Sequence, residues 1–496
     1  MASAFFLTLS GIISRIIGFF YKIFLSNIIG ARNLGVYSLI FTVYGICHTI
    51  YAAGIQTALS KLVAEQKVKN GIKGAKEILF AGCIISFSLA SALSFFVFFK
   101  SRFIAYALLN EPDCDMPLKV LSVVFPFCSI TACINGYYYG LKKALVPAVS
   151  QLVEQFIRVG TVMFIVRSFH FPDNEFACCL AITGIVAGEI GSQIFNLASL
   201  IFNKNEHAKV SCSVSDLSLV IRNAAPLTAG KLSVTILHSA ESVIIPLFLK
   251  KYGFTSDEAL SLLGILNGMV IPFILFPSAL TGALSILLLP AVSEAKAGAD
   301  NDKIKNTSCM SIKFSLITGI FSTGVFIAFG DELGCTVFNE PLCGTYLTIL
   351  SWLCPFLYVS ATFNSILNGL GRLNITLVNS VAAQILKLAL IAFLVPSYGM
   401  NGYFIAFLVS QVIVTIVDLI LVIHYAGISL NMTEYILKPT LVLIPMCSFF
   451  QSIYNNIINL TNIKPLFVTG GMLIIFTIMY FGFLIALKIV KPREFA

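Results

Sequence analysis

Residues 126–166 read PFCSITACINGYYYGLKKALVPAVSQLVEQFIRVGTVMFIV, and residues 355–395, which lie 229 positions later, read PFLYVSATFNSILNGLGRLNITLVNSVAAQILKLALIAFLV. Ten of these 41 positions are identical without a gap. The identities include polar positions such as Asn135 and Asn364, so a shared bias toward apolar residues is a weak explanation. The chain is therefore predicted to contain two similar halves. In a hydrophobic protein, such a repeat is typical of transporters whose halves enclose a central site.

The composition predicts a membrane protein. Of the 496 residues 58% are hydrophobic and only 11% are charged, whereas a soluble domain carries about 25% charged residues. Long apolar runs, without the ten-residue alternation of a β-barrel, favour an all-α polytopic membrane protein. Because a crossing needs about 20 apolar residues, we predict 14 transmembrane helices over residues 4–29, 34–60, 77–98, 117–140, 146–167, 176–203, 218–249, 259–290, 310–330, 343–370, 374–396, 400–424, 436–456 and 465–488.

The repeat and the polar breaks predict the domain organisation. We expect two pseudo-symmetric six-helix lobes, a cytoplasmic linker between them and a C-terminal appendage of two helices with a tail. The two lobes are expected over residues 1–203 and 218–424, the linker over 204–217, and the appendage with its tail over 425–496. Lys and Arg are far more frequent in the loops predicted inside than in those outside, which predicts a multi-pass cell-membrane protein with both termini in the cytoplasm. The net charge of +9 therefore indicates topology and no nucleic-acid partner.

Ionisable residues within the predicted spans are the candidate site. Each costs about 2.5–3.5 kcal/mol at the centre of a helix unless it faces a partner or a water-filled cavity. Helical spacing gathers them into polar stripes on the first, fifth and seventh spans, which predicts a chamber between the lobes. The predicted substrate-binding residues are Arg15, Lys22, Arg158 and Lys231, and the predicted coupling or cavity residues are Glu154, Gln155, His238 and Glu241.

Structural roles compete with these predictions. Glu154 and Arg158 are four residues apart, so they can simply neutralise each other. Lys22 can reach the outer end of its helix, and His238 can be a satisfied polar residue. Arg15 is different, because it lies mid-span and the first helix contains no carboxylate. Since guanidinium binds phosphate through two parallel hydrogen bonds, an anionic substrate is predicted, with phosphate or diphosphate favoured.

We predict no catalytic residues, no cofactor and no metal site, and hence no enzyme. The cysteines are scattered, and none has zinc-ligand spacing with a histidine nearby. Cys335 and Cys343 flank a predicted outer loop and are either free or joined in a disulfide. Glu111, Asp113 and Asp115, in another outer loop, are predicted to be a solvated acidic turn and not the active site of a membrane glycosyl polymerase.

Several motifs resemble a known family. They are residues 13–19 (ISRIIGF), 58–65 (ALSKLVAE), 139–158 (YGLK followed by PAVSQLVEQFIR) and 289–295 (LPAVSEA). In order, spacing and span number they resemble the polysaccharide-exporter branch of the multidrug/oligosaccharidyl-lipid/polysaccharide (MOP) flippase superfamily. Within it they look most like the group of stage V sporulation protein B-like and lipid II flippase-like proteins. The resemblance covers nearly the whole chain.

The resemblance implies a flippase for polyprenyl-diphosphate-linked saccharides, such as peptidoglycan or spore-cortex precursors, that alternates between inward- and outward-open states. It implies that Arg15 and Lys22 match basic positions of the first helix that bind the diphosphate. One departure concerns residues 34–60 and 259–290, which hold no Lys or Arg where lipid II flippases carry arginines. Lipid II itself is therefore in doubt as the substrate.

Other functions and partners stay open. The alternatives are a cation-coupled multidrug antiporter of the same superfamily and a non-transporting envelope scaffold. The expected partners are the anionic lipid-linked saccharide and membrane lipids, with Na+ or H+ as a candidate coupling cation. A two-lobed chain is sufficient as a monomer. The sequence does not specify the energy source or the sugar.

Overall fold

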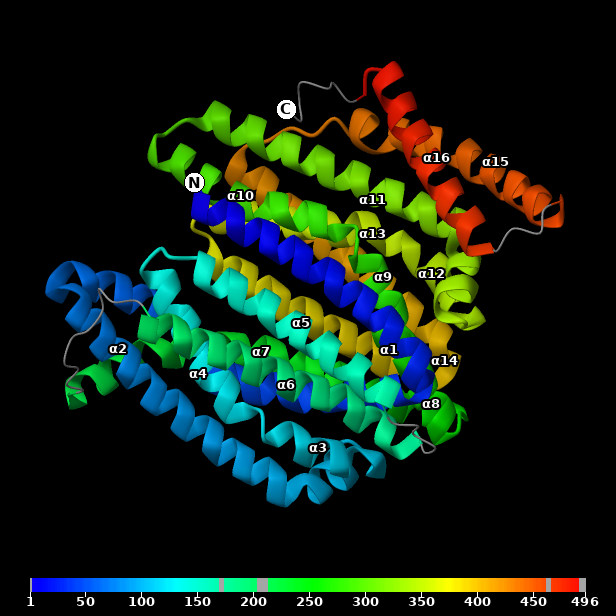
Figure 1. Cartoon of the computed structure of the whole chain (residues 1–496). Coiled ribbons are helices and arrows are strands. Elements are labelled where there is room, and N and C mark those ends of the chain that lie inside the picture. Colours follow the sequence, from blue (N-terminus) through cyan, green and yellow to red (C-terminus); the bar gives the residue numbers. More distant parts are fainter. Residues whose placement is uncertain (1, 169–173, 203–212, 461–464, 490–496) are drawn as a thin grey trace. The chain divides into compact units, whose positions relative to one another are not determined.

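The computed structural model describes residues 2–168, 174–202, 213–460 and 465–489, and every regular element among them is a helix (Figure 1). The prediction of an all-α polytopic membrane protein is confirmed. The chain divides into two compact units, Met1–Gly264 and Ile265–Ala496. The main helices of the first unit are α1 (Ala2–His48), α2 (Gly54–Phe103), α3 (Asp115–Ser122), α4 (Phe125–Gly140), α5 (Leu145–Ser168), α6 (Asn174–Phe202), α7 (Val214–Tyr252) and α8 (Ser256–Gly264).

The second unit is also helical. Its main helices are α9 (Ile271–Leu275), α10 (Ser278–Ala297), α11 (Asn301–Phe338), α12 (Pro341–Leu350), α13 (Cys354–Gly369), α14 (Leu373–Ala426), α15 (Lys438–Leu460) and α16 (Pro465–Ala486). Apolar residues of α10, α11, α13 and α14 form a common core in this unit. Buried aromatic rings add to it where α15 and α16 pack against α11, as in the contact of Phe329 with Phe450 and Phe476.

The compact units do not coincide with the lobes expected from the sequence. Helix α7 starts at the capping box of Ser213 and Asp216 and packs along α2, where Val220 and Ala224 join the core of the first unit. Most of the predicted linker and the end of the predicted tail, residues 203–212 and 490–496, lie outside the described residues. The predicted lobe boundaries therefore stay a prediction.

The number of membrane crossings is also still a prediction. By length and composition, 11 helices among the described residues can span a membrane, or 12 if the bent pair Pro112–Ser122 and Phe125–Gly140 is one span. Two continuous stretches, Ser10–Leu108 with 99 residues and Leu373–Ala426 with 54, are far longer than one crossing. A crossing takes about 20 residues, so each of these stretches can supply more than one of the 14 predicted spans.

Glycines break these long stretches. Gly30 in α1, Gly71 in α2 and Gly399 in α14 have φ angles of 74°, 67° and 58° inside otherwise helical segments. A residue with a Cβ is strained at such angles, whereas glycine is not. The direction of the chain changes at each break, so one continuous stretch yields separate helical arms.

The internal repeat is visible where α4 packs against α2 and where α13 packs against α10. A Cβ at Gly140 would lie 2.7 Å from the Ser60 carbonyl oxygen and 2.8 Å from the Val63 Cβ. At Gly369, 229 positions later, the equivalent atoms belong to Leu289 and Val292, also 229 positions later, and both lie at 2.9 Å. In each half, equivalent helices therefore pack together at an equivalent glycine.

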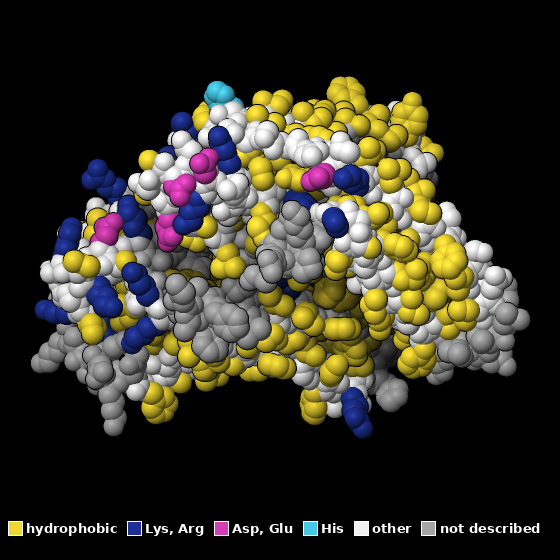
Figure 2. Space-filling view, turned by 90° about the horizontal axis from the view of Figure 1, so that it is seen from above, with side chains coloured by type: hydrophobic (Ala, Val, Ile, Leu, Met, Phe, Trp, Pro, Cys, Tyr) yellow, Lys and Arg dark blue, Asp and Glu magenta, His cyan; other side chains and the backbone are white. Residues whose placement is uncertain are grey.

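The surface is that of a lipid-exposed protein. Large apolar side chains such as Phe20, Phe95, Phe164 and Phe393 expose more than 60% of their area. Figure 2 shows hydrophobic side chains over much of one face, with Lys and Arg gathered toward one side. Exposed apolar area on this scale is unusual for a soluble monomer, so it fits the multi-pass membrane protein that the helices indicate.

Candidate functional site

All eight predicted site residues lie in the first unit, on α1, α5 and α7. Arg15 and Lys22 are seven residues apart on the first arm of α1, so they lie on one face about 10 Å apart along the axis. Both are exposed, and neither has a hydrogen bond or ion pair with any residue that the structure describes. These two cations are available to a ligand.

Arg158 and Glu154 form an ion pair within α5, between Nη2 and Oε1. Their side chains are 18% and 19% exposed, so the pair is largely shielded from water. The spacing of four residues places both groups on one face of the helix. Of the two roles that the sequence left open, the geometry favours mutual neutralisation over substrate binding for Arg158.

A second carboxylate lies beside this pair. Glu189 on α6 is 9% exposed and interacts electrostatically with both Glu154 and Arg158. Helices α5 and α6 touch here, because a Cβ at Gly188 would lie 2.8 Å from the Glu154 carbonyl oxygen. Two carboxylates and one guanidinium carry one excess negative charge when all are ionised. Within the described structure, the buried Gln155 Oε1 has no hydrogen-bond partner.

Lys231 on α7 is held by the α1–α2 connection. Its Nζ donates hydrogen bonds of 2.8 Å to the carbonyl oxygen of Ala53 and to Oγ1 of Thr57. Ala53 ends a π-helical turn, Thr49–Ala53, that joins the two helices. Thr235, one turn further along α7, lies 3.2 Å from Thr49 between hydroxyl oxygens. This part of the α7 polar stripe therefore contacts its own unit.

The last two predicted residues, His238 and Glu241, differ in burial. His238 is exposed and Glu241 is 7% exposed, although both lie on α7. Among the described residues there is no group of three or more His, Cys, Asp or Glu that could hold a metal ion. Cys335 and Cys343 are both free thiols, Cys335 exposed and Cys343 buried.

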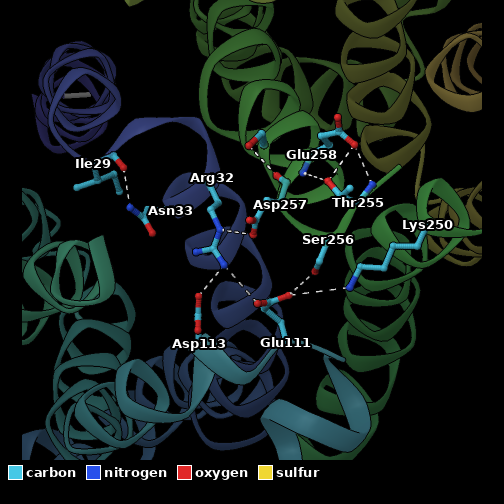
Figure 3. Close-up of polar contacts among 11 residues, drawn as sticks. Ile29, Arg32, Asn33, Glu111, Asp113, Lys250, Thr255, Ser256, Asp257 and Glu258 are labelled. Carbon is cyan, nitrogen blue, oxygen red and sulfur yellow. Dashed lines mark hydrogen bonds and ion pairs between the residues drawn. The ribbon is translucent and has the colours of Figure 1, made fainter. Parts of the chain in front are cut away.

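The structure also contains a charged cluster that the sequence analysis missed (Figure 3). Arg32, just after the Gly30 break in α1, lies between carboxylates from two distant connections of the chain. One of them, Glu111, has a side chain only 6% exposed and accepts a hydrogen bond of 3.0 Å from Ser256 Oγ. The prediction of a solvated acidic turn is wrong for Glu111. Its partners are 79 to 145 residues away in sequence, so no local pattern reveals them.

Comparison with known proteins assigns the family. A family model described as polysaccharide biosynthesis protein matches residues 1–296, more than half of the chain. The chain belongs to this family. Stage V sporulation protein B of Bacillus subtilis (strain 168) is 23% identical over 451 residues. The match covers 89% of the present chain and 87% of the relative. Lipid II flippase MurJ of the same organism is 22% identical over 460 residues, with 86% and 83% covered.

Solved structures share the fold of this family member. A lipid II flippase MurJ in an inward closed conformation matches with a TM-score of 0.70 and 14% identity, over 97% of this chain and 99% of the other. An inward-facing multidrug resistance MATE family transporter of the MOP superfamily matches with a TM-score of 0.67 and 12% identity, over 85% and 98%. The family model and the two relatives confirm the predicted resemblance to stage V sporulation protein B-like and lipid II flippase-like proteins, and the solved structures show a shared fold.

Proposed function

We propose that this protein is a flippase that moves polyprenyl-diphosphate-linked saccharides across the cell membrane by alternating access of two lobes. Two relatives support the class of substrate, namely stage V sporulation protein B and a lipid II flippase, both matched over more than four fifths of this chain. The substrate is a precursor of peptidoglycan, spore cortex or another envelope polysaccharide. The protein acts as a transporter and not as an enzyme.

One observation carries the proposal for the site. Of the four predicted substrate-binding cations, Arg158 is bound to Glu154 and Lys231 to the α1–α2 connection, while Arg15 and Lys22 have no partner among the described residues. An Arg and a Lys about 10 Å apart along one helix face can close on one diphosphate through their long side chains. We therefore assign the diphosphate to Arg15, with Lys22 beside it.

The substrate is expected to differ from lipid II in its head group. The chain has no Lys or Arg in residues 34–60 and 259–290, so fewer cations are available to a large anionic head group. A shorter or less charged saccharide on the same diphosphate fits the two cations of α1.

Transport is proposed to be coupled to a cation, either Na+ or H+. The cluster of Glu154, Glu189 and Arg158 supports this, because its excess negative charge needs a proton or a metal cation when water is scarce. On the same helix, the buried amide oxygen of Gln155 also has no hydrogen-bond partner among the described residues. His238 and Glu241 on α7 are the weaker candidates. Imposing a sodium gradient and a pH gradient separately distinguishes the two cations.

The test is flipping in proteoliposomes. The wild-type protein and Arg15→Ala are reconstituted with labelled undecaprenyl-diphosphate saccharides, and transport is followed as loss of protection from a membrane-impermeant reagent. Arg222→Ala is the matched control, because Arg222 is also an exposed arginine on a helix of this unit. We expect activity in the wild type and the control, and none in Arg15→Ala. Normal flipping by Arg15→Ala at equal protein level contradicts the assignment.

A cation-coupled multidrug antiporter is the second candidate function. The similarity to a MATE family transporter favours it, at a TM-score of 0.67. Such a pump binds cations, whereas the unpaired groups on α1 are positive. Sodium- or proton-driven export of cationic dyes, with no flipping of any diphosphate-linked saccharide, is the result that would replace the first proposal.

A further inference from the structure

Arg32 joins three segments of the first unit that are far apart in sequence (Figure 3). Its Nε lies 2.7 Å from Asp257 Oδ1 at the start of α8, and its Nη2 lies 2.7 Å from Asp113 Oδ2 in the α2–α3 connection. Nη2 is also 3.7 Å from Glu111 Oε1. The guanidinium therefore holds the α7–α8 connection and the α2–α3 connection against α1.

Burial indicates which of these contacts matter most. Asp257 is 72% exposed, so water and salt weaken its attraction to Arg32. Glu111 is only 6% exposed, and Lys250 at the end of α7 approaches its Oε2 at 4.0 Å. Ser256 at the start of α8 donates a hydrogen bond from its Oγ to the same Glu111 oxygen. Glu111 is thus the shielded centre of the cluster.

The cluster lies next to a tight helix crossing. A Cβ at Gly35 on α1 would lie 2.1 Å from the Leu260 carbonyl oxygen, and a Cβ at Gly264 on α8 would lie 1.8 Å from the Ala31 carbonyl oxygen. The two backbones therefore touch without side chains between them, as at other small-residue crossings of membrane helices. Even a small separation of the two helices would remove this backbone contact.

The charges make Arg32 the hub of the cluster. Arg32 and Lys250 face Glu111, Asp113 and Asp257, so three carboxylates meet two cations. Without Arg32, three carboxylates would share one lysine, and their repulsion would push the α7–α8 connection away. The start of α8 keeps its own cap, because Glu258 accepts from the Thr255 backbone and hydroxyl at 2.8 and 2.9 Å. The cluster therefore adds little to the formation of helix α8. Its main effect is to hold α8 against α1.

We propose that the Arg32 cluster is an ionic latch that holds α7 and α8 against α1 and the α2–α3 connection in one state of the transport cycle, and that opens in the other. The charge bias of the loops predicts that this end of the unit lies on the outer side, so opening the latch would separate these helices on that side. The inference rests on the proposed alternating-access function. A cluster of charges suits this task, because water can replace its contacts when it opens.

The test measures the latch directly, without substrate. Spin labels are attached at Met116→Cys and Tyr252→Cys, two exposed positions on either side of the cluster, in a background without accessible cysteines. Double electron–electron resonance in lipid gives the distance distribution. We expect one short distance in the otherwise wild-type protein. In Arg32→Ala, the population at a longer distance should rise about tenfold, within the range of coupling between conformational states.

Controls separate the latch from a general loss of structure. Lys251→Ala removes a neighbouring charge whose ammonium lies over the Phe248 ring, outside the cluster, and should leave the distances unchanged. Arg32→Lys, which keeps a positive charge beside the carboxylates, should retain most of the short-distance population. If Arg32→Ala does not fold, Glu111→Gln provides the same comparison. A distribution in folded Arg32→Ala or Glu111→Gln that matches the wild type overturns the latch.

Flipping by the same variants tests the role in transport. A rate within twofold of the wild type in a variant with an open latch also overturns the proposal, since the latch would then play no part in the cycle. If the wild type itself flips no saccharide, the proposed function fails, while the distance measurements still report whether Arg32 controls the docking of α7 and α8.

Discussion

Arg15 and Arg32 lie on the same helix, yet their surroundings differ completely. Arg15, on the first arm of α1, has no hydrogen bond or ion pair with a described residue. Arg32, just past the Gly30 break, is within 4 Å of three carboxylates. A guanidinium that the protein has already paired stabilises a particular arrangement of helices. One that the protein leaves unpaired in a membrane span is available to an anionic ligand.

The position along the helix explains the difference. Arg32 lies close to the ends of α2 and α7, where the connections supply Glu111, Asp113 and Asp257. The first arm of α1 has no carboxylate of its own. The comparison therefore predicts separate effects: changes near Arg15 should alter transport, and changes near Arg32 should alter the docking of helices.

The largest effect is expected from giving Arg15 a partner. In Gly11→Glu a carboxylate lies four residues before Arg15, the favourable direction for an ion pair on a helix, and nothing lies within 4 Å of a Cβ at Gly11. The new carboxylate should compete with the substrate diphosphate. We expect flipping to fall about a hundredfold, or about 2.7 kcal/mol. The neutral variant Gly11→Gln should keep its activity, and equal loss in both variants would point to packing instead.

Breaking the α5 ion pair should mainly change stability. Arg158→Gln leaves Glu154 and Glu189 without their cation in a shielded site, which should lower the free energy of unfolding by about 2 kcal/mol. The double variant Glu154→Gln with Arg158→Gln should recover much of this loss. Thermal unfolding in detergent measures both. Full retention of stability in Arg158→Gln would show that water already solvates the pair.

A smaller loss of stability is expected at the α1–α8 crossing. In Gly264→Ala the new Cβ meets the Ala31 carbonyl oxygen, so the backbones must separate, at a cost of about 1–2 kcal/mol. Gly470→Ala on α16 is the control, because nothing lies within 4 Å of a Cβ there. That variant should be neutral or slightly stabilising. A thermal midpoint unchanged in both variants would argue against backbone contact at the crossing.

The smallest effect is expected from the exposed side of the latch. Asp257→Asn removes a carboxylate that is 72% exposed, and it should destabilise the docked state by less than about 1 kcal/mol. Glu111→Gln, at 6% exposure, should have the larger effect. The spin-label distance distributions of the two variants, measured at low and at high salt, show which variant has the larger long-distance population. A larger effect of Asp257→Asn would mean that Glu111 is not the centre of the latch.

The sequence predicted part of the candidate site. The spacing of four between Glu154 and Arg158 already indicated their pairing, because helical geometry alone brings them together. The isolation of Arg15 also followed from the sequence, since no carboxylate occurs on its helix. Lys231 was different: its partners Ala53 and Thr57 are more than 170 residues away, so its present contacts with α2 were not predictable.

By itself, the sequence determined an all-helical membrane protein with an internal repeat, because apolar run length and residue identity at a fixed displacement are properties of the chain alone. The contacts of Gly140 and Gly369 show that this repeat persists in the packing. Only the tertiary structure decided which charges from distant segments are paired. An ion pair needs two groups within about 4 Å, and for Arg32 that proximity arises from helices that meet across 81 and 225 residues of chain.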